Sequence, residues 1–201
     1  MAGPEMKTPV DAPHVLPETL TTLQDQFRRL HRHLSAEKRS AYARDLPFED
    51  LLFDRWERAR TLGFGAEASI YQSSYVFGEV KVGAHTWIGP FTLLDGSGGL
   101  DIGTYCSISA GVHIYSHNSV KWAVSGGNTP YERRPVRIGD CCFIGPHSVI
   151  RDGITIGDHV VVGAHSFVNK DVPPFSIVAG APARVIGRVR LDDEDVAFEY
   201  F

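Results

Sequence analysis

The chain has 201 residues and a formal net charge of −4 at pH 7, and 43% of its residues are hydrophobic and 22% charged, which fits one globular domain. This charge balance lacks the basic surface expected of a nucleic-acid-binding protein, so we expect no nucleic-acid partner. Because no stretch approaches the roughly 18 apolar residues of a membrane span, and the N-terminus lacks the apolar segment of a signal peptide, we expect no membrane span and a cytoplasmic protein.

The N-terminal third of the chain contains a proline-rich start followed by helical patterns. Residues 1–16 lack periodic apolar positions, so we expect a flexible arm there, and we expect a helical region over residues 17–64. A second helix of this region is expected from Pro47, which suits a first helical turn, to Gly63. The first helix is predicted by apolar residues that return every third or fourth position and therefore share one face. They are Leu20, Leu23, Phe27, Leu30 and Leu34.

Residues 65–189 are dominated by an aliphatic residue at every sixth position. Six matches neither the 3.6-residue period of a helix nor the two-residue alternation of a strand, so the pattern indicates short strands joined by corners, as in a parallel β-helix of hexapeptide repeats. Glycine follows several of these residues, and we expect it to permit a sharp turn. The aliphatic positions are Ile70, Val76, Val82, Ile88, Leu94, Ile102, Ile108, Ile114, Ile138, Ile144, Ile150, Ile156, Val162 and Val168.

Two segments interrupt this pattern. The segment Leu94–Leu100, LDGSGGL, delays the pattern by two positions. A loop at residues 115–136 separates Ile114 from Ile138 by 24 positions, which is a multiple of six. A segment that can leave the repeat and return without disturbing it is a common location for functional residues.

A β-helix leaves unpaired backbone groups at its two ends. We expect the helical region to cover one end and the residues after Val185 to cover the other, with an acidic and then aromatic tail at residues 190–201. The three cysteines are too few and too irregularly spaced for a disulfide framework or a zinc knuckle, so we expect reduced thiols. They are Cys106, Cys141 and Cys142.

The repeat, the histidine-bearing loop before it and the ending NKDVPPFSIVAGAPARVIGRV resemble the hexapeptide acyltransferase superfamily, in particular its galactoside, maltose and xenobiotic acetyltransferases. The resemblance covers Ile70 to Val189. It implies a left-handed β-helix of triangular section, in which the fourteen aliphatic positions make between four and five coils. It also implies a homotrimer and acetyl-CoA as acyl donor, and therefore an acetyltransferase.

Within the loop, the resemblance implies that His117, in the sequence YSHN, is the general base. Acetyl transfer to a hydroxyl requires removal of a proton as the thioester carbonyl is attacked, and imidazole titrates near physiological pH. We expect direct transfer in a ternary complex without a covalent intermediate. The group that orients His117 is left open, and Glu132 is the nearest loop carboxylate in the sequence.

For acetyl-CoA, the resemblance implies that the pantetheine arm lies along small residues at coil corners, which Pro146 and Ala164 match, with Phe143 as a flanking aromatic residue. Pro146 departs from the usual small polar residue and offers no N–H. Further matches face the CoA phosphates and adenine in the family, and two of them are cations, which suit a polyphosphate unless they are simply exposed corner charges. These matches are Asn169, Lys170 and Arg184.

The expected acceptor is a sugar or glycan precursor with a free hydroxyl. The resemblance implies that Asp95 accepts hydrogen bonds from its hydroxyls, although an Asp-Gly turn would explain Asp95 equally. Trp122 either stacks on a sugar face or packs the loop against the protein. N-acetylation of an amino sugar or a nucleotide-linked amino sugar is the alternative activity.

Two further alternatives are a non-catalytic scaffold and a zinc enzyme of the carbonic anhydrase kind. The zinc alternative depends on His147 and His165, which are 18 residues apart, together with His113 and His117. His147 and His165 occupy outward positions of their hexads, where surface histidines are a simpler explanation. We therefore expect no metal.

Overall fold

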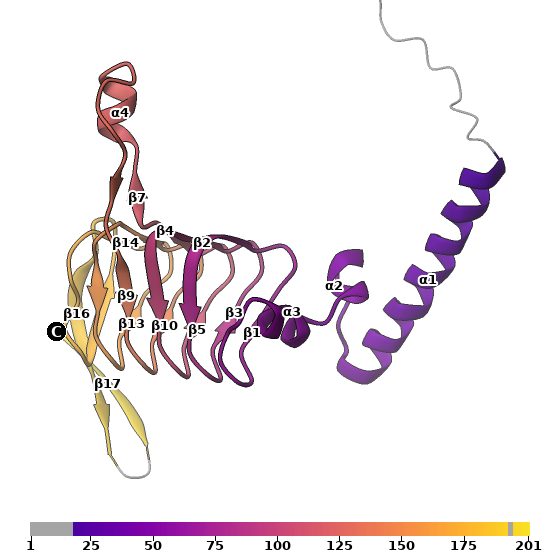
Figure 1. The fold of residues 1–201 in the computed structure, drawn as a ribbon. Helices are drawn as coiled ribbons and strands as arrows, with labels where there is room; N and C mark the ends of the chain where they lie inside the picture. Colours follow the sequence, from indigo (N-terminus) through magenta and orange to yellow (C-terminus); the bar gives the residue numbers. More distant parts are fainter. Residues whose placement is uncertain (1–17, 193–194) are drawn as a thin grey trace, which may run out of the picture. The chain divides into compact units, whose positions relative to one another are not determined.

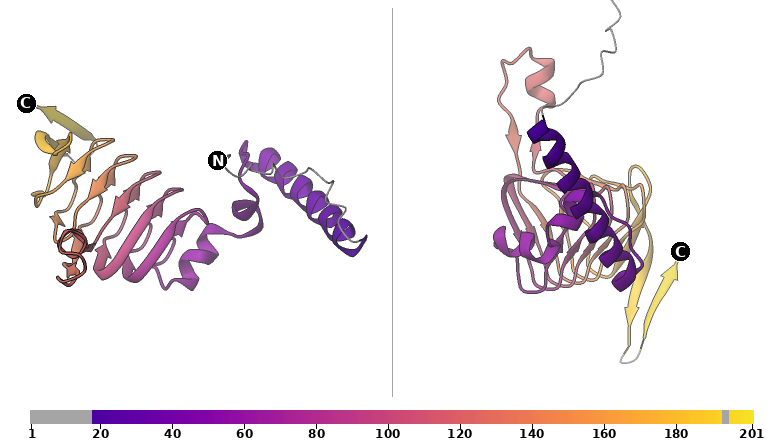
Figure 2. Two further views of the ribbon diagram at one scale, coloured as in Figure 1. Left: turned by 90° about the horizontal axis from the view of Figure 1, so that it is seen from above. Right: turned by 90° about the vertical axis from the view of Figure 1, so that its right-hand side faces the viewer.

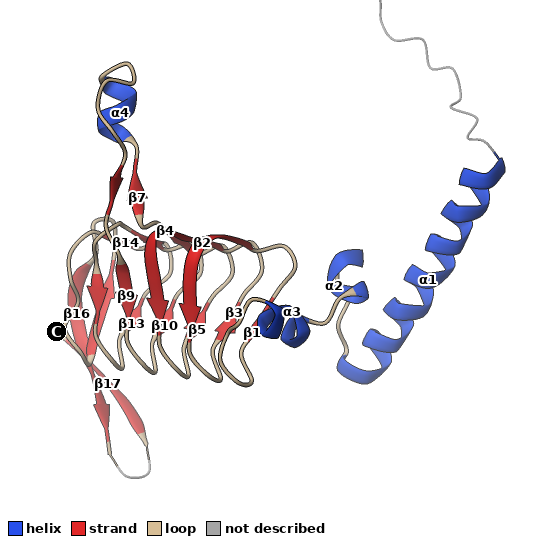
Figure 3. Ribbon diagram, in the orientation of Figure 1, coloured by secondary structure: helices blue, strands red, loops and turns tan. Residues whose placement is uncertain are grey.

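The computed structural model describes residues 18–192 and 195–201, so the arm expected at residues 1–16 lies outside the described residues. Two compact units make up the chain, Met1–Leu51 and Leu52–Phe201. Most of the described helices belong to the N-terminal part, and strands dominate the rest (Figure 3). No described helix is both long and apolar enough to cross a membrane.

Helix α1 (Glu18–Tyr42) confirms the helix predicted from the apolar spacing. On its apolar face, Leu20, Leu23 and Phe27 remain between 45% and 48% exposed. Helix α2 (Phe48–Leu52) begins with Phe48, whose ring lies edge-on to that of Phe27 at a centroid distance of 6.0 Å. Aromatic pairs in this geometry stabilise a structure beyond the burial of their surface.

The prediction of one helix between Pro47 and Gly63 is wrong, because α2 ends before a separate helix, α3 (Arg55–Thr61). Asp54 is the N-cap of α3. Its carboxylate accepts hydrogen bonds from the amides of Trp56 and Glu57, both at 2.9 Å. An Asp at this position satisfies amides that have no partner within the helix, so a new helix starts here.

Helix α3 lies against the first strand, β1 (Ser69–Ile70). Ala59 of α3 is fully buried, and the Arg58 guanidinium donates to the carbonyl of Ser74 at 2.7 Å. Through these contacts α3 covers the open end of the first coil.

The rest of the second unit is the expected parallel β-helix, built from short strands that stack coil upon coil (Figure 1). The strands of its first face are β1, β3 (Trp87–Ile88), β5 (Ser107–Ile108), β10 (Phe143–Ile144), β13 (Val161–Val162) and β15 (Ser176–Ala179). Burial of one such aliphatic side chain contributes about 1.5–3 kcal/mol, so the column is the main source of stability. The stacked aliphatic residues that are 0% exposed are Ile70, Ile88, Ile108, Ile144 and Val162.

Two long strands, β2 (Tyr75–Val82) and β4 (Leu93–Ile102), pass from the second face to the third. The second face continues with β6 (His113–Ile114), β11 (Val149–Ile150) and β14 (Phe167–Val168). The third face continues with β9 (Val136–Ile138) and β12 (Thr155–Ile156). Seen along the stack, successive coils overlie one another (Figure 2).

The first face has six stacked parallel strands, which is more than the four to five coils expected from the sequence would provide. The sixth-residue period ends at Val168, but Val172 forms a parallel bridge with Ile156, and Val178 stacks on Val162. The last turn is shorter than a full repeat, so periodicity alone missed it.

The glycines of the repeat have a different role from the expected one. The left-handed backbone conformation occurs two positions later, for example at His147 with φ of 58°. Gly145 instead permits a close approach of coils, because a Cβ placed there would lie 2.6 Å from the amide nitrogen of Ala164 in the next coil. The expectation that these glycines make the turn is therefore wrong.

The aliphatic stack continues past both interruptions, and the long loop returns in register, as predicted. The pairing of β2 with β4 shifts between Gly78 and Val80, which absorbs the additional residues of LDGSGGL, and Ile102 then pairs with Val82. The long loop leaves as an antiparallel pair, β7 (His117–Asn118) with β8 (Glu132–Arg133), and contains the short helix α4 (Val120–Val124). This hairpin projects from the stack of coils (Figure 1).

Beyond the last coil, the chain reverses into two antiparallel strands. Strand β16 (Arg184–Leu191) pairs with β15, and β17 (Val196–Tyr200) pairs with β16. These strands extend the first face at the end of the stack opposite α3.

Candidate active site

The centre of the candidate site is a hydrogen bond between the loop histidine and a buried carboxylate. His117 Nδ1 lies 2.5 Å from Asp95 Oδ2, and the two residues are separated by 22 positions in the sequence. The side chain of His117 is 36% exposed, whereas that of Asp95 is 1% exposed. One edge of the ring is therefore fixed from the protein interior while the other remains accessible.

Asp95 is held ionised by the donors around it. Its Oδ1 accepts from the Ser97 amide at 2.9 Å, and its Oδ2 accepts from the Ser116 amide at 3.0 Å. Burial raises the pKa of Asp95, but hydrogen bonds from Ser97, His117 and Ser116 outweigh it and hold the pKa below its usual value. An ionised Asp95 can only accept, so Nδ1 of His117 is the donor and, in the neutral ring, Nε2 is free to accept a proton.

Ser116 connects the two interruptions of the repeat. It is 0% exposed, its hydroxyl accepts from the Gly98 amide at 2.7 Å, and its carbonyl accepts from the Arg134 amide at 2.9 Å. With its own amide donating to Asp95, this residue joins the LDGSGGL segment to the start and end of the loop.

We predict that Ser116→Ala lowers the free energy of unfolding by about 1–3 kcal/mol, because the Gly98 amide loses its buried partner. Urea unfolding measures the change. Ser119→Ala is the matched control, since Ser119 is exposed and its side chain makes no capping hydrogen bond. Equal stability of the two variants would contradict the connecting role of Ser116.

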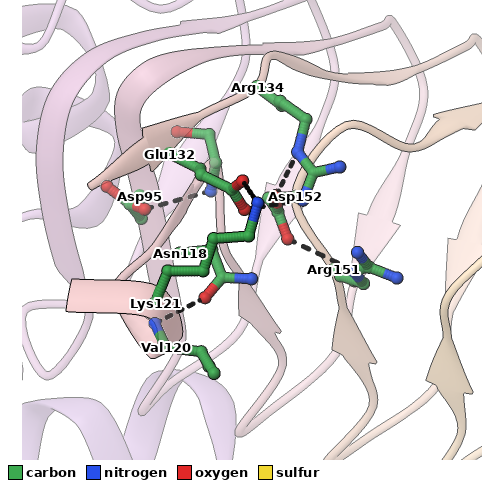
Figure 4. Close-up of polar contacts among 9 residues, drawn as sticks. Asp95, Asn118, Val120, Lys121, Glu132, Arg134, Arg151 and Asp152 are labelled. Carbon is green, nitrogen blue, oxygen red and sulfur yellow. Dashed lines mark hydrogen bonds and ion pairs between the residues drawn. The ribbon is translucent and has the colours of Figure 1, made fainter. Parts of the chain in front are cut away.

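The loop is held by its own charges and rings. Glu132 was a candidate for orienting His117, but the orienting carboxylate is Asp95, and Glu132 is paired with Lys121 at 2.5 Å (Figure 4). Trp122 is 43% exposed and lies edge-on to Tyr131 at 5.3 Å, and the Tyr131 ring is 6.3 Å from that of His117. Trp122 therefore packs within the loop and still presents a large part of its surface.

Stacking brings several separate residues to one corner of the β-helix. Leu94, Ile114, Ile150 and Val168 pair in register along the second face. The residues that immediately follow them therefore succeed one another along the corner where the loop leaves. They are Asp95, Tyr115, Arg151 and Asn169.

The remaining candidates lie at the neighbouring corner or beyond it. Pro146 and Ala164 follow paired positions of β10 and β13, and the Pro146 carbonyl accepts from the His165 amide at 2.9 Å. Phe143 is 41% exposed on the first face, and Arg184 pairs with Ala179 at the end of that face. The candidate acetyl-CoA residues thus flank the second face from both sides.

Two candidates near the loop corner, Lys170 and Asn169, differ in the exposure of their polar groups. The Lys170 side chain is exposed. The side-chain oxygen of Asn169 is buried and has no hydrogen-bond partner among residues 18–192 and 195–201. A buried acceptor without a partner is costly, so this atom is a position where a ligand N–H would be favoured.

Sequence reasoning did not identify Tyr131, Arg151 and Asp152 as part of this region. Arg151 and Asp152 line a cavity of about 240 Å³ that is also lined by His117. The Tyr131 ring lies beside that of His117. Arg151 and Asp152 follow an aliphatic position of the repeat, as Asp95 does. Placing the residues after each aliphatic position side by side, coil by coil, would have drawn attention to them.

Two of the histidines considered for zinc lie next to each other in successive coils. His147 and His165 stack with ring centroids 5.1 Å apart. In the part of the chain that the structure describes, no group of three or more His, Cys, Asp or Glu side chains is arranged to hold a metal ion.

Comparison with known proteins supports a β-helix transferase. Residues 135–170 match the family described as bacterial transferase hexapeptide (six repeats). The chain is 36% identical over 101 residues to galactoside O-acetyltransferase of Escherichia coli (strain K12), a match that covers 46% of this chain and only 50% of that protein. It is 30% identical over 169 residues to chloramphenicol acetyltransferase of Agrobacterium fabrum, covering 75% of this chain and 78% of that protein.

A solved structure agrees with these relatives. The crystal structure of a hexapeptide-repeat acetyltransferase of Vibrio cholerae, complexed with acetyl coenzyme A, has a TM-score of 0.60 and 27% identity, covering 85% of this chain and 89% of that one. The fold and the sequence relationships together define a hexapeptide-repeat transferase. This chain belongs to the hexapeptide-repeat acetyltransferase family.

Proposed function

We propose that this protein is an acetyl-CoA-dependent O-acetyltransferase that acts on a hydroxyl of a sugar or glycan precursor, with His117 as general base. The observation that carries the proposal is the 2.5 Å hydrogen bond from His117 Nδ1 to the buried carboxylate of Asp95. This bond leaves Nε2 to accept a proton at the exposed edge of the ring.

The transfer is direct. As His117 removes the acceptor's proton, the acceptor oxygen attacks the thioester carbonyl. The C–S bond then breaks, and the protonated His117 returns the proton to the sulfur, so that CoA leaves as the thiol. A cysteine nucleophile is not part of the mechanism, because Cys106 and Cys142 are each 2% exposed and the exposed Cys141 does not line the cavity beside His117. A hydrogen bond with Cys106 and burial raise the pKa of Cys142, which disfavours the thiolate.

Asp95 positions His117 in this proposal. The role implied by the resemblance, a hydrogen bond between Asp95 and the acceptor, is not part of this proposal. The Asp95 side chain is only 1% exposed, and both of its oxygens accept hydrogen bonds from within the protein. Trp122, which is half-exposed, remains a residue for contact with the acceptor.

Acetyl-CoA supplies the acetyl thioester and is bound across the second face. The orphaned oxygen of Asn169 accepts from an amide of the pantetheine arm, which passes Phe143, Pro146 and Ala164. The exposed cations Lys170 and Arg184 pair with the CoA phosphates. The protein acts as a homotrimer, an assembly inferred from its family resemblance, with sites between neighbouring subunits.

CoA release from acetyl-CoA tests this function, measured against a panel of sugars, amino sugars and nucleotide-linked sugars, with His117→Ala as control. Release that depends on both a hydroxyl acceptor and His117 supports O-acetylation. Release only with amino sugars would overturn the hydroxyl assignment in favour of N-acetylation, and absence of both CoA release and CoA binding would overturn the transferase itself.

We predict that Lys170→Ala combined with Arg184→Ala weakens CoA binding at least about tenfold, because two charge-assisted contacts to phosphate are lost. Calorimetric titration of CoA measures the effect. The melting temperature should stay close to that of the unchanged protein, since both side chains are exposed. Equal CoA affinity in the two proteins would remove these residues from the site.

A further inference from the structure

The cavity beside His117 is lined by an exposed arginine, Arg151, that general-base catalysis does not require. It lies over the second face, where Val149 and Phe167 form its floor, and the loop supplies His117 and Asn118. Arg151 and Asp152 complete the wall. Because Ile150 pairs with Ile114, Arg151 lies one rung from the point where the loop leaves the coil.

A buried carboxylate, that of Asp152, holds Arg151 in place. Asp152 is 4% exposed, and its Oδ1 accepts from Arg151 Nε at 3.3 Å. Its Oδ2 accepts from Arg134 Nε at 2.6 Å (Figure 4). Two guanidinium groups therefore share one carboxylate, and the closer contact belongs to Arg134.

Two charged side chains of opposite sign, Arg151 and Asp152, line the cavity. The carboxylate of Asp152 is buried and accepts hydrogen bonds from both Arg134 and Arg151, whereas the guanidinium of Arg151 is 42% exposed. Arg151 is therefore the charge that the cavity presents to a ligand.

Arg151 lines the cavity and has N–H groups that its contact with Asp152 does not use. Its side chain is 42% exposed, and its contact with Asp152 uses Nε. The described residues provide no hydrogen-bond partner for its two terminal nitrogens. A planar guanidinium with free terminal N–H groups matches the paired oxygens of a carboxylate or phosphate.

We propose that the acceptor carries an anionic group, a carboxylate or a phosphate, and that Arg151 binds it while His117 deprotonates the acceptor hydroxyl. This inference rests on the proposed function and specifies its substrate class. An acidic sugar or a sugar phosphate fits it, whereas a neutral sugar leaves the terminal nitrogens of Arg151 unused.

The test compares acceptors that share one sugar ring and carry either no anionic group, a phosphate, a carboxylate or a nucleoside diphosphate: a neutral hexose, its 1-phosphate and 6-phosphate, its uronic acid and its nucleoside diphosphate derivative. In the unchanged protein we expect kcat/KM to be at least about tenfold higher for one of the anionic forms, and the phosphate and carboxylate arms identify the preferred group. In Arg151→Ala this preference should fall at least about tenfold, with KM for acetyl-CoA unchanged, and Arg151→Lys should restore part of it.

Arg137→Ala is the matched control, since Arg137 is a 71% exposed cation on β9 that does not line the cavity. The proposal is overturned if Arg151→Ala affects neutral and anionic acceptors equally, if it acts as Arg137→Ala does, or if it raises KM for acetyl-CoA instead. His117-dependent transfer to neutral sugars alone would overturn this inference but leave the proposed function intact. Absence of transfer to every acceptor would overturn both.

Discussion

His117→Ala is expected to lower the rate of acetyl transfer at least about a hundredfold, because removal of a general base typically costs a factor of 10² to 10⁴. The loss should appear in kcat, since the ring is needed as the acceptor oxygen attacks. KM for acetyl-CoA should change little, because the residues proposed to bind it lie on other strands. Steady-state CoA release at saturating acetyl-CoA measures both quantities.

A second substitution at the same position separates catalysis from structure. His117→Asn retains an N–H that can donate to Asp95 but has no basic nitrogen, so we expect the same loss of turnover with better retention of stability. Circular dichroism and size-exclusion chromatography check that both variants keep the fold and assembly of the unchanged protein. Unchanged turnover in either variant would remove His117 from the mechanism.

Asp95→Asn is expected to lower kcat roughly tenfold to a hundredfold, less than His117→Ala, because the base remains but loses the acceptor that fixes its tautomer. Asparagine cannot reproduce the carboxylate here. Both oxygens of Asp95 face N–H donors, so whichever way the amide is turned, its NH2 group meets a donor. A KM for acetyl-CoA close to that of the unchanged protein would confirm that the loss is catalytic.

The same substitution has a pH-dependent effect on stability. The pKa of Asp95 is lowered from 3.8 in the folded protein, so its ionised form stabilises the fold above that value, and the contribution disappears as the pH falls through the lowered pKa. Asp95→Asn should therefore be less stable near neutral pH, and the difference should narrow in acid. Urea unfolding at pH 7 and at progressively lower pH measures this trend, and a difference independent of pH would contradict an ionised Asp95.

The architecture was predictable from the sequence because the six-residue period is a local property. Each inward aliphatic residue, such as Ile108 or Ile144, is recognised without knowing its neighbour in space, and both are 0% exposed. The helical break at Asp54 was missed because the apolar spacing continues across it, although an Asp followed by a charged first turn is itself a start signal. The short last turn containing Val172 does not follow the period.

The partner of His117 was not predictable by the same means. Glu132 is closer in the sequence, but partners in a β-helix are set by stacking between coils. The coil from Leu94 to Ile114 is lengthened by the LDGSGGL segment, and only their pairing places Asp95 next to the loop exit. Arg151 enters the site for the same reason, through the pairing of Ile114 with Ile150.

The central claim is that Asp95 acts through His117, and a double-mutant cycle tests it most directly. Acetyl-transfer rates are measured for the unchanged protein, Asp95→Asn, His117→Ala and the double variant. We predict that Asp95→Asn lowers kcat tenfold or more in the unchanged protein but less than about twofold once His117 is absent, because residues that act as a unit are not additive. An equal loss in both backgrounds would mean that the two residues act independently, which would contradict this account.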